Sequence, residues 1–195
     1  MPNFTKGAAR IVFAQGVHNL TLDSANTTGE LITAKFGGPE PTVTTTDDGT
    51  VTITRRGAQH PFDWVRRTAV VSLNPGVAWD IEIRGVATQV EADLTGLRLR
   101  SITVTEGCTE ARFQLPPTDV PVPVHFGSGV RKVTLLRPPE TYAALRAQKG
   151  LTSLSLDGEW IGTLASADWR SAGPQGATGG YEITLASGSN HLTIA

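Results

Sequence analysis

Apolar residues recur along the chain in a unit that reads apolar-x-apolar, two spacers, a turn residue, three spacers and apolar-x-apolar. One copy runs from Ile102 to Phe113, with Gly107 at its turn. The turn position recurs at residues 16, 86, 107, 129, 150 and 188. All 24 apolar slots of these six copies hold apolar residues, although only 39% of the chain is apolar. The chain therefore contains an internal structural repeat.

Alternation with a period of two predicts β-strands with one buried face, because successive side chains of a strand point to opposite sides. The central turns are 21, 22 and 21 residues apart, which is the length of one solenoid coil. One unit cannot bury its apolar face alone, so the units must stack. We predict an all-β fold: a single-stranded right-handed β-helix (β-solenoid) or a closely related stacked-β repeat fold, with a period of 21–22 residues.

Glycine at the turns has two physical explanations. It tolerates a positive φ, and it has no Cβ to clash where one coil approaches the next. The copy around residue 86 is the exception, because Val86 takes the turn position and the glycine is displaced by one to Gly85. We expect one or both of these requirements at the repeat turns.

The length predicts a single domain over residues 1–195. Residues 76–195 form the repeat array, in which a loop insertion at 157–180 accounts for the 38 residues between the last two turns. Part of that insertion, the glycine- and alanine-rich run 171–180, is typical of a mobile loop. Leu145 and Ala147 lie in phase with the apolar slots, which favours a strand within the array.

The same stretch, residues 138–150, also fits a helix, because Pro138 and Gly150 bracket good helix formers. Tertiary context overrides propensity over so short a run, so we favour the strand and keep the helix as the alternative.

Residues 1–75 form a different, N-terminal β portion. The alternation over 43–54 around Asp48-Gly49 predicts a hairpin. A polar excursion over 55–67 follows it. A stack leaves unpaired backbone at both ends, so we expect this portion and the final copy, which ends at Ala195, to act as caps.

The repeat resembles the bacterial putative-adhesin, or toast-rack, domains over about residues 76–195. Their repeats place Gly-Gly-Ala-Ser or Gly-x-Gly before an alternating strand. The segments that carry the resemblance are 79–87, 106–109, 126–130 and 187–194. The chain departs from the family pattern where paired glycines survive only approximately and where Val86 replaces a turn glycine. The resemblance implies an all-β helical stack without established catalytic residues, and it carries no site residue over to this chain.

Charge and composition narrow the classes of partner. The 17 Lys and Arg residues and 18 Asp and Glu residues give a net charge of −1, which does not favour nucleic acid or an anionic membrane surface. No run of 18 apolar residues exists, so no membrane span is predicted. The chain as given has no secretory signal, so we expect a cytoplasmic location, or an envelope location if it belongs to a longer protein.

Residues with catalytic or metal-binding chemistry are sparse, so we predict neither an enzyme nor a cofactor nor a metal site. The four histidines show no ligand spacing, and Cys108, the one cysteine, follows a turn glycine. Acidic pairs could cleave glycosides, but Asp47 and Asp48 belong to a turn, whereas Glu91 and Asp93 belong to an exposed strand face. A carbohydrate-active hydrolase or lyase on a β-solenoid stays the second alternative.

Two groups of residues are candidates for binding a partner. The basic-aromatic group could bind an anionic partner, or its aromatic rings could fold back over the end of the stack; its members are Arg55, Arg56, Phe62, Trp64, Arg66 and Arg67. Trp160 and Trp169 could line a glycan-binding surface or anchor their loop.

The sequence thus predicts a non-enzymatic structural or interaction domain of unknown partner. Self-association, as a homo-oligomer or end to end, is compatible with its stacked architecture. The first alternative is a module that binds a glycan or another polymer through loop aromatics.

Overall fold

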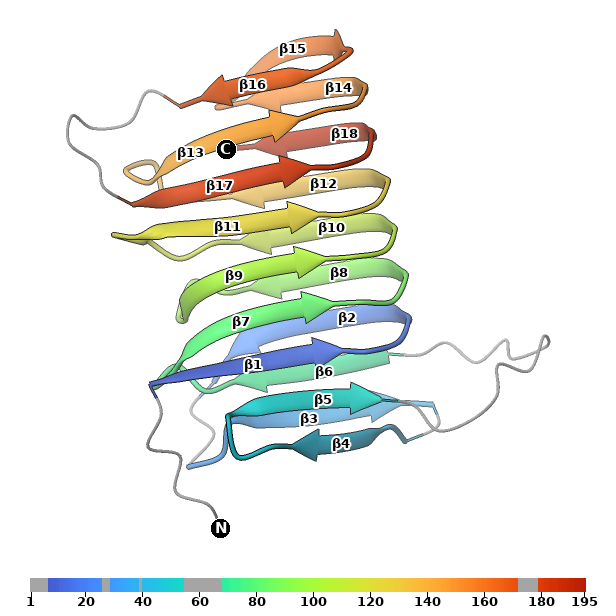
Figure 1. Cartoon of the computed structure of the whole chain (residues 1–195), viewed down its shortest axis with the longest axis vertical. Coiled ribbons are helices and arrows are strands. Elements are labelled where there is room, and N and C mark those ends of the chain that lie inside the picture. The colour runs from blue at the N-terminus through green and yellow to red at the C-terminus, as the bar shows by residue number, and fades with distance from the viewer. Residues whose placement is uncertain (1–6, 26–28, 39, 55–67, 172–178) are drawn as a thin grey trace.

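The computed structural model describes residues 7–25, 29–38, 40–54, 68–171 and 179–195, which form two nine-stranded sheets stacked face to face (Figure 1). In spatial order, sheet A contains β16 (Ala167–Arg170), β13 (Tyr142–Ala147), β17 (Gly180–Leu185), β11 (Pro121–Phe126), β9 (Arg98–Val104), β7 (Ala78–Ile83), β1 (Ala8–Phe13), β5 (Thr50–Thr54) and β4 (Thr42–Thr45). Sheet B contains β15 (Glu159–Leu164), β14 (Leu151–Leu156), β18 (Ser189–Ile194), β12 (Val130–Leu136), β10 (Cys108–Gln114), β8 (Ala87–Asp93), β2 (Val17–Ser24), β6 (Thr68–Leu73) and β3 (Ile32–Gly37).

The chain alternates between the sheets, so each coil of the stack contributes one strand to each. Strands of successive coils pair in parallel, with Ile81 opposite Ile102 and Ile102 opposite Val124, which are offsets of 21 and 22 residues. The prediction of an all-β stacked repeat with alternating strands is therefore confirmed. Among the described residues, no helix is long and apolar enough to cross a bilayer.

The core lies between the two sheets and is built from the repeat slots. Each of the 24 slots is at most 5% exposed. Within this core, the rings of Phe113 and Phe126 meet edge to face, with their centroids 6.4 Å apart. Full burial of one large apolar side chain stabilises a fold by about 1.5–3 kcal/mol, so the slots supply most of the cohesion between the sheets.

Close approach of the coils, and not positive φ, requires glycine at the repeat turns of Gly16 and Gly188, whereas an added Cβ on Gly129 or Gly150 would make only ordinary contacts of 3.9 and 3.8 Å. None of the repeat-turn glycines has a positive φ. A Cβ on Gly188 would lie 2.7 Å from the Gly150 oxygen, and one on Gly16 would lie 2.9 Å from the Val86 oxygen. Backbone hydrogen bonds join these turns, as where the Val17 N–H donates to Val86 O at 3.1 Å.

Close approach of the coils also explains the glycine displaced to residue 85. A Cβ on Gly85 would lie 2.2 Å from the Gly16 nitrogen, whereas the Val86 side chain points outward and is 56% exposed. The displaced glycine therefore sits where the two backbones meet most closely.

The order of coils in space differs from their order in the chain (Figure 1). The first coil, β1–β2, lies between β5–β6 and β7–β8, and the last coil, β17–β18, lies between β11–β12 and β13–β14. The prediction that the final copy caps the stack is therefore wrong. An apolar unit with two apolar neighbours buries more surface inside a stack than at its end, and the repeat pattern does not specify which units become neighbours.

Antiparallel strands close both ends. At one end β3 pairs with β6 and β4 with β5, and at the other β15 pairs with β14 and β16 with β13. The described part of the expected loop insertion is therefore largely strand, since residues 159–164 and 167–170 form β15 and β16. Residues 172–178, within the run expected to be a mobile loop, lie outside the described residues.

Two local predictions are confirmed. Residues 142–147 form the strand β13, as the phase of their apolar positions indicated. Residues 42–54 form the hairpin of β4 and β5, whose turn contains Gly49 at a φ of +90°. In this turn the Asp48 carboxylate accepts a hydrogen bond from the Thr50 N–H at 3.1 Å.

Candidate functional site

The outer faces of the two sheets carry the polar residues that alternate with the core slots. Parallel register aligns these residues into rows that cross many strands. One unbroken row on sheet A, polar except for the buried Val12, contains Thr44, Thr52, Val12, Glu82, Thr103, His125, Thr184, Arg146 and Asp168. Each face is thus a broad surface on a rigid scaffold.

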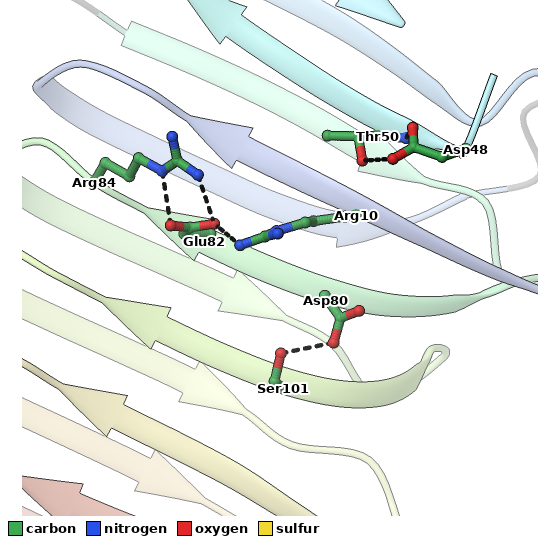
Figure 2. A network of polar contacts seen from close by, with 7 residues as sticks. All are labelled: Arg10, Asp48, Thr50, Asp80, Glu82, Arg84 and Ser101. Atoms are coloured by element: carbon green, nitrogen blue, oxygen red, sulfur yellow. Dashed lines mark hydrogen bonds and ion pairs between the residues drawn. The ribbon is translucent and has the colours of Figure 1, made fainter. Parts of the chain in front are cut away.

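A closed network of charges occupies the part of the sheet A face over β1, β7 and β9 (Figure 2). Glu82 accepts from Arg10 and from the Arg84 Nε, the latter at 2.7 Å. Asp80 accepts from the Ser101 hydroxyl at 2.7 Å. The hydrogen bond from Arg84 is the main cause that lowers the pKa of Glu82, with Arg10 adding to it against the opposing effect of partial burial. The charges here are satisfied within the protein.

A hollow of about 340 Å³ opens on the same face over β16, β13 and β17. We name it the β13 hollow, and its lining includes Tyr142, Ala144, Arg146, Asp168, Arg170, Glu182 and Thr184. Cross-strand register places Ala144 between Arg170 and Glu182, and Arg146 between Asp168 and Thr184. The small Ala144 side chain forms the floor, and longer polar side chains surround it.

The four charged groups of the β13 hollow are available to a ligand. They are Arg146, Asp168, Arg170 and Glu182, and all four are exposed. Within the described ranges of the chain, none of their side chains forms an ion pair or hydrogen bond. This contrasts with the network around Glu82, where the charged side chains of neighbouring strands pair with one another.

The acidic pairs considered from the sequence lie where a structural role accounts for them. Asp48 is engaged by Thr46 and Thr50 in the hairpin turn, and these hydrogen bonds lower its pKa. Asp93 accepts from the Thr95 hydroxyl at 2.7 Å, and Glu91 lies opposite Arg112 on the exposed face of sheet B. The two pairs belong to different sheets, so the structure does not assemble them into one site.

Cys108 and the histidines form no reactive cluster in the described part of the chain. Burial raises the pKa of Cys108 to about 11, so the thiol stays protonated near neutral pH. His18 and His191 are exposed and His125 is half-buried, while His60 lies outside the described residues. The described residues contain no group of three or more His, Cys, Asp or Glu side chains that could hold a metal ion.

The predicted partner-binding residues fall into two sets. The basic-aromatic group, Arg55, Arg56, Phe62, Trp64, Arg66 and Arg67, lies outside the described residues. Trp160 is 72% exposed on β15 of sheet B, and its Nε1–H donates to the Ser153 hydroxyl at 3.4 Å. Trp169 lies on β16 of sheet A, opposite Leu145, and packs against the core. The two tryptophans therefore do not share one surface.

No sequence pattern predicts the β13 hollow. Its residues come from three strands, two of which, β16 and β17, meet only through β13. Each residue reads singly as an exposed strand position. Only the spatial order of the strands brings them together, and the chain order does not reveal it.

Comparison with known proteins gives a match by structure. No protein-family model matches the chain, and no curated protein matches it by sequence. The crystal structure of a putative cell adhesion protein from Clostridium sporogenes matches with a TM-score of 0.79 at 16% sequence identity. The match covers 100% of this chain and 96% of that one. At this identity it shows the fold, and it extends the resemblance expected for residues 76–195 to the whole chain.

Proposed function

We propose that this protein is a non-enzymatic interaction domain of the adhesin type, which binds its partner through the outer face of a sheet. The observation that carries the proposal is a row of paired positions that crosses all nine strands of sheet A in unbroken register. Its members are polar on every strand except β1, where the row holds Val12, which is 3% exposed. A rigid array of this kind offers many weak contacts over a wide area. Adhesion between surfaces requires that kind of distributed contact.

Two further observations support this function. Three of the residues that the sequence singles out for catalytic chemistry have other roles: Asp48 is held in a turn, Asp93 accepts from Thr95, and Cys108 is a buried, protonated thiol. The fold is also shared over its full length with a protein described as a cell adhesion protein.

Bead retention under flow tests the proposal. Beads coated with the full chain would be passed over bacterial and animal cell layers, with albumin-coated beads as the baseline. Thr52→Arg with Thr103→Arg adds bulk and charge to the sheet A face, and Thr134→Arg with Thr193→Arg does the same on sheet B. Each double variant controls for the other, and we expect one of them to abolish retention. Retention no higher than that of albumin beads, or unchanged in both variants, would overturn the proposal.

Self-association is a second candidate, favoured by the strands at the ends of the stack. Among the residues that the structure describes, β3, β4, β15 and β16 each pair on one side only, which leaves the other side of each for pairing with another strand. Sedimentation velocity over a wide range of concentrations would test this. A monomer at every concentration contradicts it.

We also infer that the coils wind to the right. β7 and β9 are parallel neighbours in sheet A, and the chain crosses to sheet B through β8 between them. Crossover connections between parallel strands of one sheet are almost always right-handed, because of the twist of the strands. A crystal structure would establish the hand directly.

A further inference from the structure

We propose that the β13 hollow binds a neutral, hydroxyl-rich saccharide unit. The inference rests on the proposed function, since it specifies one ligand class and one place on the sheet A face. It differs from the glycan-binding alternative based on tryptophans, because Trp160 lies on the other sheet and Trp169 faces the core.

The shape of the hollow suits a small ring. Arg170 and Glu182 stand on strands either side of β13, two strand spacings or roughly 10 Å apart, with Ala144 between them. Tyr142 and Arg146 bound the space along β13, because they are two residues from Ala144 and point to the same side. A volume of about 340 Å³ falls at the small end of the range for small-molecule sites.

The charges of the hollow select among ligand classes. Two guanidinium groups and two carboxylates give a net charge of zero. Asp168 and Glu182 would repel a polyanion, and Arg146 and Arg170 would repel a polycation. A neutral ligand with many polar groups avoids both penalties.

Hydrogen-bonding chemistry then favours hydroxyls. Guanidinium groups only donate hydrogen bonds, and ionised carboxylates only accept them. A hydroxyl does both, so neighbouring hydroxyls of a sugar can donate to Glu182 or Asp168 while accepting from Arg170 or Arg146. Sugar hydroxyls also point outward around the ring, so one unit above Ala144 faces charged groups on opposite sides. The half-buried Tyr142 ring adds an apolar surface for the sugar's C–H groups.

The absence of internal pairing is what distinguishes this cluster from the rest of the face. Arg146 lies directly opposite Asp168, yet within the described residues the two do not form an ion pair. Around Glu82 the same residue types close on one another. Groups left open beside a hollow can form charge-assisted hydrogen bonds to a ligand without first breaking contacts in the protein.

Titration of the isotope-labelled full chain, followed by amide chemical shifts, tests the inference. The probes are glucose, galactose, mannose and N-acetylglucosamine with their β-linked disaccharides, and glucuronate and inorganic phosphate serve as anionic probes. We expect saturable binding of at least one neutral saccharide, with shifts centred on β13, β16 and β17. Arg170→Ala and Glu182→Ala should each weaken it at least about tenfold. Ala144→Leu should abolish it by filling the hollow while keeping every charge.

Arg84→Ala is the matched control, because it removes an arginine of the same face from the closed network, and it should leave binding unchanged. Thermal melting would establish that each variant is folded, and any variant that fails to fold is replaced by the others of the set. Binding of glucuronate or phosphate alone, no binding of any neutral saccharide, or binding unaffected by Ala144→Leu would each overturn the inference.

The bead assay separates this inference from the proposed function. If beads carrying Ala144→Leu are retained as well as the wild type and no saccharide binds, the inference fails while the proposed function stands. If wild-type beads are not retained but the saccharide still binds the hollow, the proposed function fails and the binding site stands.

Discussion

The two ends of the stack are assembled in the same way but finished differently. At each end, antiparallel strands close both sheets, and the terminal coil of the chain is placed between two other coils (Figure 1). At the N-terminal end, β3 and β4 pair in unbroken register over six and four residues. At the C-terminal end, β15 shifts register twice against β14 and contains Gly162 at a φ of +95°. The place of a coil in the stack is therefore independent of its place in the chain, and the edges of both sheets are formed by added antiparallel strands.

The largest expected effect comes from disrupting either inserted coil. Ile183 of β17 and Ile11 of β1 are both at most 1% exposed, and a buried, unpaired carboxylate at such a site costs more than about 3 kcal/mol. β13 and β11 meet only through β17, and β5 and β7 meet only through β1. Ile183→Asp should therefore release the C-terminal end, and Ile11→Asp the N-terminal end.

Hydrogen exchange read by mass spectrometry would check this comparison. Ile183→Asp should remove protection from β13–β16 while β7–β10 stay protected, and Ile11→Asp should do so for β3–β6. Uniform loss of protection in both variants would show that the stack unfolds as one unit, which contradicts the idea of two separable ends.

A smaller effect concerns Tyr181, which ties the last coil to the rest of the stack. Its buried hydroxyl donates to the Pro116 carbonyl oxygen, 65 residues away in the chain. Tyr181→Phe leaves that acceptor unsatisfied and should lower the free energy of unfolding by about 1–3 kcal/mol. Tyr142→Phe is the control, because Tyr142 is half-buried and should change it by less than about 0.5 kcal/mol. Urea titration gives both values.

The stability that Tyr181 contributes should depend on pH, because its hydroxyl can ionise. Burial raises the pKa of Tyr181, so the unfolded chain ionises first, above about pH 10. The stabilising contribution is complete below that pH and falls as the pH rises through it. The cost of Tyr181→Phe should therefore shrink between pH 9 and pH 11. A cost that stays constant over this range would show that the hydroxyl is not buried.

The sequence predicts the individual coils but not which coils pack against each other in the stack. The reason is physical. A strand such as β9 can be predicted from Ile102 and Val104, because burial of one strand face requires apolar and polar residues to alternate along that segment. Which coil packs against which depends on complementary surfaces that every copy of the repeat shares. The repeat pattern therefore predicts the final copy at an end of the stack, which β15 and β16 occupy instead.

The β13 hollow is even harder to predict from the sequence, because it depends entirely on which strands become neighbours. Arg146, Arg170 and Glu182 are ordinary exposed strand residues in the sequence, and they become a hollow only because β17 follows β13 in space. Trp160 and Trp169 stood out by residue type, yet the alternation of strands between the sheets separates them. Residue type alone was thus a weaker guide than register.

Two of the glycines in a left-handed conformation, one at each end of the stack, offer a matched test of intermediate size. Gly162 lies in β15 and Gly49 in the turn between β4 and β5, at φ values of +95° and +90°. Alanine is strained at such angles, so Gly162→Ala and Gly49→Ala should each cost about 1 kcal/mol. Thermal melts would measure this. A cost at Gly49 alone would show that the bulged β15 adjusts its backbone more easily than the regular hairpin does.

The smallest effect on stability, and the sharpest test of the difference in edge protection, comes from the apolar residues exposed at the two ends. Val43 of β4 is 42% exposed and Ile161 of β15 is 41% exposed. Lysine at either position should change the free energy of unfolding by no more than about 0.5 kcal/mol, because both are surface sites.

A regular edge strand is the better template for pairing with a second chain, whereas a bulge turns backbone groups away from that chain. If copies associate, Val43→Lys should therefore reduce the association seen in sedimentation velocity more than Ile161→Lys does. The reverse order would mean that the bulged end is the one that associates, and that its register shifts serve a purpose other than protection.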